Sequence, residues 1–179
     1  MVRRLYYVGS DKYDFPVEEI PIVEIVKPEY RIVAKNFKAI VRTDTNQVLG
    51  IVSKKYRLVK HQDVIERFSS VLGEPDFVRV LRNGAKMFAY FRINNKTIEN
   101  SEVELGLLVS NGYDGRLGIN IKLFGITWIC DNLAMFGKLL GQLKIIHRGF
   151  QLLARLDKTI VKIQRAVDVG FTIMELSLI

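Results

Sequence analysis

Apolar and polar residues alternate in short runs through the middle of the chain, which is the pattern of half-buried β-strands. The runs form three pairs, and the members of each pair are separated by a turn segment containing Gly, Asn or Asp. The pairs are residues 39–42 with 48–52, 77–81 with 86–93, and 104–110 with 117–124. Asn83-Gly84 accepts the positive φ angles of a tight turn, and the glycines of residues 111–115 allow similar curvature. The pattern therefore predicts three β-hairpins.

Three other segments have the features of α-helices. Residues 61–72 place their apolar side chains on one side and are followed by Gly and Pro, which end helices. An Asp-Asn pair stands before an apolar run at residues 131–140, so a second helix is predicted there, ending near Gly141. Residues 150–167 have the strongest helical periodicity. Strands with one inserted helix, followed by helices, indicate an α+β fold in which helices pack on one face of an antiparallel sheet.

The chain of 179 residues is long enough for one self-sufficient core. No repeat and no low-complexity linker divides it. We therefore expect residues 1–36 to form a partly extended amino-terminal arm and residues 37–179 to form a single α+β domain.

The chain is basic, with 27 Lys and Arg against 19 Asp and Glu and a formal net charge of +8. The positive charge is concentrated in residues 31–96 and 122–165, which favours an anionic partner such as nucleic acid. A single cysteine excludes an intrachain disulfide and a cysteine-rich zinc site. Residues 1–30 do not resemble a signal peptide, and no run approaches the ~18 apolar residues of a membrane span. We expect a cytoplasmic protein with no membrane partner, and the aliphatic-rich composition also fits a thermophilic source.

The predicted carboxy-terminal helix has two faces of different character. Its apolar positions share one side, and four basic side chains share the opposite side. The basic residues are Arg155, Lys158, Lys162 and Arg165. Asp157 lies elsewhere on the helix, so no acidic residue is interspersed in this basic stripe. Such a stripe is typical of a solvent-exposed helix face, and it is equally typical of a surface that binds a phosphate backbone. Neighbouring like charges repel each other, and a bound polyanion would relieve this repulsion.

A second basic group surrounds the Asn83-Gly84 turn. It consists of Arg79, Arg82 and Lys86. Aromatic residues follow on the same predicted strand, with Phe88 and Tyr90 on one face and Phe91 on the other, so at most one set can be exposed to stack on bases. No Gly-rich phosphate loop or dinucleotide-binding fingerprint accompanies these residues.

The residue types allow two catalytic alternatives. A Cys130 nucleophile could pair with His147 and be assisted by Asp131 or Asp114, although the apolar surroundings of Cys130 are typical of a core cysteine. A metal site of His147, Asp114 and Asp131 lacks a recognisable ligand spacing. The acidic residues near Glu104 have no paired-carboxylate pattern and are interpreted as solvated loop and strand-edge charges. We therefore predict neither a catalytic residue nor a cofactor.

Several motifs, taken in their order and spacing, resemble the domain-of-unknown-function 932 family of phage/plasmid-like proteins. They are Val41-Arg42-Thr43-Asp44-Thr45 with residues 48–53 and 56–59, Asn111-Gly112-Tyr113-Asp114-Gly115, Trp128-Ile129-Cys130-Asp131-Asn132-Leu133, and Lys144-Ile145-Ile146-His147. The positions that match the family's motifs most closely are Asn111, Asp114, Gly115, Cys130, Asn132 and His147. Asp131 stands where the family usually has Gln. The resemblance implies mobile-element biology and possible work on DNA.

The strand and helix order also resembles, at the level of fold alone, the single-strand annealing recombinases. Our first hypothesis is a non-enzymatic, homo-oligomeric viral or plasmid protein that binds single-stranded nucleic acid, most simply DNA, in annealing or recombination. Its phosphate contacts would come from the helix stripe and the second basic group. Two alternatives are an accessory protein that meets an acidic protein partner, for example in counter-defence, and an enzyme of unknown substrate.

Overall fold

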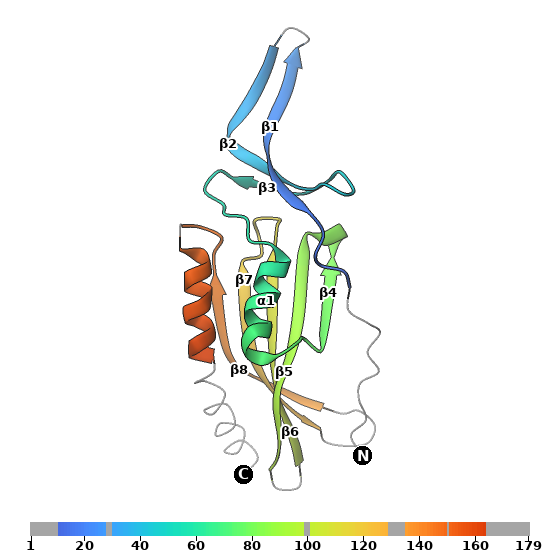
Figure 1. Ribbon diagram of the computed structural model, residues 1–179, viewed down its shortest axis with the longest axis vertical. Helices are drawn as coiled ribbons and strands as arrows, with labels where there is room; N and C mark the ends of the chain where they lie inside the picture. Colours follow the sequence, from blue (N-terminus) through green and yellow to red (C-terminus); the bar gives the residue numbers. More distant parts are fainter. Residues whose placement is uncertain (1–10, 28–29, 99–100, 129–134, 150, 164–179) are drawn as a thin grey trace.

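The computed structural model describes residues 11–27, 30–98, 101–128, 135–149 and 151–163. These residues form two antiparallel sheets and two helices (Figure 1), so the fold is α+β, as predicted. The elements in chain order are β1 Val17–Lys27, β2 Tyr30–Arg42, β3 Gln47–Ser53, α1 His61–Leu72, β4 Phe77–Leu81, η1 Arg82–Gly84, β5 Lys86–Ile98, β6 Ser101–Gly112, β7 Ile119–Trp128, β8 Met135–Ile145 and a helix of residues 152–163.

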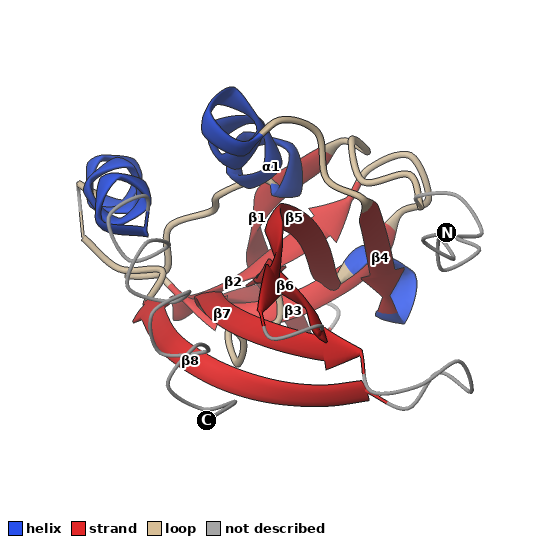
Figure 2. Cartoon of the chain, turned by 90° about the horizontal axis from the view of Figure 1, so that it is seen from below, coloured by secondary structure: helices blue, strands red, loops and turns tan. Residues whose placement is uncertain are grey.

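The five-stranded sheet has the order β4-β5-β6-β7-β8, with every neighbouring pair antiparallel. Two of the predicted hairpins, β4–β5 and β6–β7, are confirmed in it. Asn83 and Gly84 have the expected positive φ angles, 57° and 112°, and Arg82 has one as well, 54°. Figure 2 shows α1 and helix 152–163 side by side on one face of this sheet, where the sequence predicted that helices would pack.

The other predicted hairpin, β2–β3, is also confirmed, but it belongs to a separate three-stranded sheet with β1. The single sheet expected from the sequence is therefore two sheets. β1 and about half of β2 lie within the predicted arm of residues 1–36, and in its described part they pair as antiparallel strands (Figure 1). β1 is an edge strand, which lets it contain Pro21, a residue without an N–H to donate, and its register shifts just after that proline.

The helix predicted for residues 131–140 is wrong over the part that the structure describes. Residues 135–145 form β8, which pairs with β7 from Trp128↔Met135 to Ile119↔Ile145. Gly137 and Gly141 each disfavour a helix by about 1 kcal/mol relative to Ala, and a strand here satisfies the backbone groups along the outer side of β7. Residues 131–134, with the cap-like Asp and Asn, lie outside the described residues.

Helix α1 has the predicted bounds. Its first turn is held by the N–H of Lys60, which donates to the Asp63 carboxylate at 3.3 Å, and it ends at Gly73, whose φ is 82°. The helix buries Val64, Ile65 and Phe68 against the sheet. This burial matches the apolar side that the sequence predicted.

Two hydrophobic clusters hold the fold. The larger one lies between the five-stranded sheet and the two helices, where Phe68 meets Phe91 with ring centroids 5.9 Å apart. The smaller one joins the three-stranded sheet to one end of the five-stranded sheet through residues such as Phe15, Ile40 and Tyr113. In the described part of the chain no helix is long and apolar enough to cross a membrane.

Candidate functional site

The helix of residues 152–163 presents its basic stripe to solvent. Leu152, Leu156, Ile160 and Ile163 are buried. Arg155, Lys158 and Lys162 are exposed on the other side, and none of them forms an ion pair with a described residue. Arg165 lies outside the described residues. The division of the helix into two faces is therefore as predicted over its described turns.

The acidic residue of this helix is held away from the basic stripe. The Asp157 carboxylate accepts a hydrogen bond from Arg67 of α1, with 2.7 Å between Oδ1 and Nη1. This ion pair joins the two helices that cover the sheet. The face of the helix that carries Arg155, Lys158 and Lys162 therefore has basic charge only.

The second basic group is arranged differently. Arg79 forms an ion pair with Asp11 at 3.3 Å, and Lys86 lies 3.4 Å from the Asp114 carboxylate. Arg82 is exposed on the turn after β4. This turn and helix 152–163 lie at opposite edges of the five-stranded sheet (Figure 1), so the structure does not bring the two predicted basic groups together.

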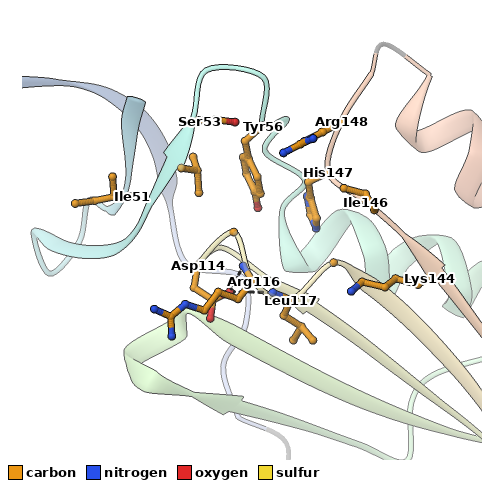
Figure 3. Close-up of a pocket in the computed structure, with 13 residues that line it drawn as sticks. Ile51, Ser53, Tyr56, Asp114, Arg116, Leu117, Lys144, Ile146, His147 and Arg148 are labelled. Atoms are coloured by element: carbon orange, nitrogen blue, oxygen red, sulfur yellow. Dashed lines mark hydrogen bonds between the residues drawn. The ribbon is translucent and has the colours of Figure 1, made fainter. Parts of the chain in front are cut away.

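A hollow of about 430 Å³ opens between the two sheets, close to the start of helix 152–163 (Figure 3). Its wall combines apolar, aromatic and charged side chains from three separate segments of the chain. The lining residues are Ile51, Val52, Ser53, Tyr56, Asp114, Gly115, Arg116, Leu117, Gly118, Lys144, Ile146, His147 and Arg148. In Figure 3, Lys144 and Arg148 approach from the β8 side, whereas Arg116 lies across the hollow on the turn between β6 and β7.

His147 is positioned by the segment that precedes α1. The N–H of Arg57 donates to the His147 carbonyl at 2.9 Å, and His147 Nδ1 lies 3.0 Å from the Arg57 carbonyl oxygen. Its imidazole stacks on Tyr56, with ring centroids 4.8 Å apart and planes 7° apart. The Tyr56 hydroxyl donates to the Gly112 carbonyl at 2.8 Å. The ring pair therefore ties the end of β8 to the β6–β7 turn.

The protonation state of His147 follows from these contacts. A carbonyl oxygen can only accept, so Nδ1 carries the proton and Nε2 holds a lone pair. Burial lowers the pKa of His147, which keeps the ring neutral. Nε2 is shielded from solvent and has no hydrogen-bond partner among the described residues. A buried polar atom without a partner is uncommon and calls for an explanation.

Beside the hollow, a buried network surrounds His61. Its Nε2 lies 2.9 Å from the Gly84 carbonyl oxygen, and its Nδ1 lies 3.0 Å from the Asn111 amide nitrogen, so Nε2 donates and Nδ1 accepts. The His61 backbone N–H donates to the Tyr113 hydroxyl at 2.7 Å, and the two rings stack with centroids 4.0 Å apart. Burial lowers the pKa of His61 to about 4. Because each ring nitrogen has a partner, this histidine fits a structural role.

Asp114 stays ionised at the edge of the hollow. Burial alone would raise its pKa, but hydrogen bonds from the backbone N–H groups of Leu117 and Arg116 and the nearby Lys86 ammonium outweigh burial and lower it. The carboxylate thus fixes the turn at Gly115, whose φ is 72°. Among the four charged residues that line the hollow, three are basic, and Lys86 offsets the acidic one.

The motif positions and the catalytic alternatives are only partly described. Asn111, Asp114, Gly115 and His147 lie around the hollow and the His61 network. Cys130 and Asn132 lie outside the described residues, as does Asp131, so the proposed Cys130–His147 pair and the His147, Asp114 and Asp131 metal site lack a described member. Within the described ranges, no three or more His, Cys, Asp or Glu side chains gather as a metal site.

Sequence reasoning missed two features of these strands. It did not single out Tyr56, Arg116, Lys144 or Arg148 as neighbours, because these residues are far apart in the chain and meet only through long-range pairing, such as the bridge between Tyr56 and Arg148. It also interpreted Glu104 as a surface charge, which is wrong. Glu104 is buried on β6, accepts a hydrogen bond from the Tyr90 hydroxyl at 2.6 Å and lies 3.2 Å from Arg92.

Comparisons with known proteins place the chain in a family. No curated protein and no solved structure matches it, so the likeness to single-strand annealing proteins stays a hypothesis. A family model described as a domain of unknown function (DUF932) matches residues 48–164, which include every residue that lines the hollow and all described turns of the basic helix. Because this match covers more than half of the chain, the protein belongs to the DUF932 family.

Proposed function

We propose that the protein binds single-stranded nucleic acid through the solvent face of helix 152–163. The observation that carries the proposal is the set of three exposed cations, Arg155, Lys158 and Lys162, without an ion-pair partner among the described residues. Cations spaced along one helix face can each contact a phosphate of a flexible strand, and such contacts supply most sequence-independent affinity.

The ion pairs elsewhere in the molecule sharpen this proposal. Arg79 and Lys86 each have an acidic neighbour in the folded protein, so a phosphate would have to compete with Asp11 and Asp114 for them. We therefore assign the phosphate contacts to the helix. The exposed Arg82 on the β4–β5 turn should contribute only a small share of the affinity. Annealing of complementary strands would be a further activity of the same surface.

Binding should be measured by fluorescence anisotropy with single-stranded DNA, single-stranded RNA and duplex DNA, each at several salt concentrations. The variant Arg155→Glu/Lys158→Glu/Lys162→Glu should lose single-strand binding at moderate salt. Substitution of the same three residues by Ala is milder. It should make the plot of log K for single-strand binding against log salt less steep by about 2, since each phosphate contact with a single strand contributes about 0.7 to the slope.

The matched control is Lys12→Glu/Lys35→Glu/Lys55→Glu, which makes the same change of net charge at three exposed lysines outside the helix. It should bind more tightly than the helix variant, because only long-range attraction is reduced. Circular dichroism should show that both variants are folded. Unchanged single-strand binding by a folded helix variant would rule out the proposed surface.

A further inference from the structure

The outer side of the three-stranded sheet is apolar although it faces solvent. Val17, Ile40, Leu49 and Val52 lie on the inner side, where they are buried between this sheet and the end of the five-stranded sheet. An antiparallel sheet with one solvated face normally carries polar side chains on that face. The outer side therefore departs from the pattern of a sheet that ends at water.

Five residues on three neighbouring strands form this outer surface. The residues from β1, β2 and β3 in its central row are Ile20, Ala39 and Ile51, which stand directly opposite one another in the register of the sheet. Phe37 lies two residues before Ala39 on the same side of β2, and Val48 of β3 pairs with the residue two positions after Ala39. We call these five residues the apolar face.

The large side chains of the apolar face are open to solvent. The exposed fractions are 39% for Ile20, 51% for Phe37, 61% for Val48 and 63% for Ile51. Both described helices pack on the five-stranded sheet, and the three-stranded sheet projects beyond them (Figure 1). Exposed apolar residues are ordinary when they are scattered singly, but a contiguous group of them marks an interaction site.

The charges of the molecule argue against nucleic acid as the occupant of this face. The basic residues Arg155, Lys158 and Lys162 lie on helix 152–163, and no member of the second basic group belongs to the apolar face. A phosphate backbone gains its affinity from cations, whereas an apolar face is covered most favourably by another apolar surface. The occupant should therefore present apolar side chains.

The shape of the apolar face is complementary to itself. Ala39 has a single methyl group and stands between Ile20 and Ile51, so it forms a depression in the central row. Phe37, one row away on the same strand, projects a half-exposed ring. A symmetric dimer needs a surface that fits its own copy, so that each of two residues contacts the other across the interface. When two β2 strands cross in opposite directions at position 38, each Phe37 ring enters the depression at Ala39 of the other copy.

We propose that the apolar face joins two copies of this chain into a symmetric dimer, in which the two three-stranded sheets pack face to face. Sheets packed in this way interdigitate their side chains in a layer about 10 Å thick. Lys38 does not hinder the contact, because its ammonium lies on the inner side, 2.6 Å from the Glu19 carboxylate and 2.8 Å from the Tyr56 carbonyl oxygen. Five residues on each copy make a small interface, so the dimer is reversible.

The dimer does not depend on the nucleic-acid binding proposed above. Helix 152–163 packs on the five-stranded sheet, and none of its residues belongs to the apolar face. Dimerisation can therefore be measured without nucleic acid, and the two proposals can fail separately.

The first experiment is sedimentation velocity of nucleic-acid-free protein at high salt, over a wide range of protein concentration. The wild type should change from monomer to dimer as the concentration rises. Phe37→Asp should stay monomeric at concentrations where the wild type is a dimer, because a buried carboxylate would face the partner's apolar face. The matched control is Leu139→Asp, a large apolar residue that is 49% exposed on β8, and this variant should dimerise like the wild type.

Circular dichroism should show that both variants are folded. A wild type that is monomeric at every concentration would overturn the proposal. A folded Phe37→Asp variant that still dimerises would overturn it as well.

The second experiment exchanges the ring and the depression. Phe37→Ala removes the ring, and Ala39→Phe places two rings in the same space, so each should weaken dimerisation at least about tenfold. The double variant Phe37→Ala/Ala39→Phe restores one ring and one depression on each copy, and its dimerisation should return to within about threefold of the wild type. A variant that was merely unstable would not recover in this way. Failure of the double variant to recover would contradict the proposed pairing.

A third measurement locates the contact without a substitution. In a mixture of ¹³C-labelled and unlabelled protein, an isotope-filtered nuclear Overhauser experiment should show contacts between the Phe37 ring of one copy and the Ala39 methyl group of the other. A dimer without these contacts would overturn the assigned face. Vesicles of phosphatidylcholine and phosphatidylglycerol test a lipid surface instead. If the protein is monomeric and binds vesicles, and Phe37→Asp abolishes that binding, the face belongs to a membrane and the dimer is ruled out.

Discussion

Arg67 of α1 and Asp157 of helix 152–163 form an ion pair between the two helices, with 2.7 Å between Nη1 and Oδ1, although 90 residues separate them in the chain. The pair has two effects on the molecule. It links the two neighbouring helices, and it neutralises the acidic residue nearest to the basic stripe. The charge of the stripe therefore depends on a contact that no local sequence pattern reveals.

Removal of this carboxylate should affect binding more than stability. Asp157→Asn should lower the free energy of unfolding by no more than about 1 kcal/mol, since both partners are partly exposed and such pairs contribute little. Affinity for single-stranded nucleic acid at low salt should rise roughly twofold, because Arg67 is then no longer neutralised and the net charge of the region around the stripe increases by one. Glu18→Gln, at an exposed position on β1, makes the same change of charge and should alter neither quantity. A larger gain from Glu18→Gln would refute a local effect.

The buried histidines predict how stability changes with pH. His61 has its pKa lowered to about 4 by burial, and burial also lowers the pKa of His147, whereas in the unfolded chain both take up a proton near pH 6.5. The unfolded state therefore binds more protons in this window, so stability is complete above about pH 6.5 and falls as the pH drops toward 4. The loss attributable to His61 should reach about 3 kcal/mol near pH 4.

Urea unfolding at a series of pH values tests this expectation. Between about pH 6.5 and pH 5 the carboxylates stay ionised in both states, so the slope reports the histidines alone. In His61→Gln, the side-chain amide can donate to the Gly84 carbonyl and accept from the Asn111 amide, but it does not titrate. The free energy of unfolding of this variant should therefore change less steeply with pH between about pH 6.5 and pH 5. An identical slope in the wild type and in His61→Gln would show that His61 is not the group responsible.

Local signals were sufficient for much of this fold. The β4–β5 hairpin follows from Asn83-Gly84, where a positive φ is needed at both positions, and α1 follows from apolar spacing with Gly73 behind it. The two faces of helix 152–163 follow from a period of 3.6 residues. In each case the residues that decide the structure are close together in the chain.

The remaining features depend on partners far away in sequence. Residues 135–145 are a strand because they complete the sheet beside β7, and this pairing outweighs the cap-like residues before them. The stacking of His147 on Tyr56 joins segments 91 residues apart, and the pairing of Arg79 with Asp11 spans 68. The sequence pointed to His147 as a possible catalytic base or metal ligand and through the family resemblance, and it contained no sign that Tyr56 lies beside it.

The contact between the two sheets should be sensitive to one added methyl group. A Cβ on Gly50 of β3 would lie 2.4 Å from the Tyr113 carbonyl oxygen and 2.7 Å from the Asp114 Cα, and both are backbone atoms. Gly50→Ala should therefore lower the free energy of unfolding by about 1–3 kcal/mol, the usual cost of overpacking. Gly141→Ala on β8 is the control, because no atom of another described residue beyond its two chain neighbours lies within 4 Å of its Cβ position, and it should be neutral or slightly stabilising. Equal effects of the two substitutions in chemical unfolding would show that the sheets are not in close contact at Gly50.

The hydroxyl of Tyr113 should contribute to stability through a single hydrogen bond. It accepts from the His61 backbone N–H at 2.7 Å, in a region where both residues are buried, so water cannot replace it. Tyr113→Phe preserves the stacking on His61 but leaves a buried N–H without a partner, and it should lower the free energy of unfolding by about 1–3 kcal/mol. Tyr13→Phe removes the same atom from a partly exposed ring and should change stability by less than about 0.5 kcal/mol. Amide hydrogen exchange gives an independent measurement. The His61 N–H should exchange faster in Tyr113→Phe than in the wild type, because it has lost its acceptor. Unchanged protection of this N–H would mean that the Tyr113 hydroxyl does not hold the start of α1.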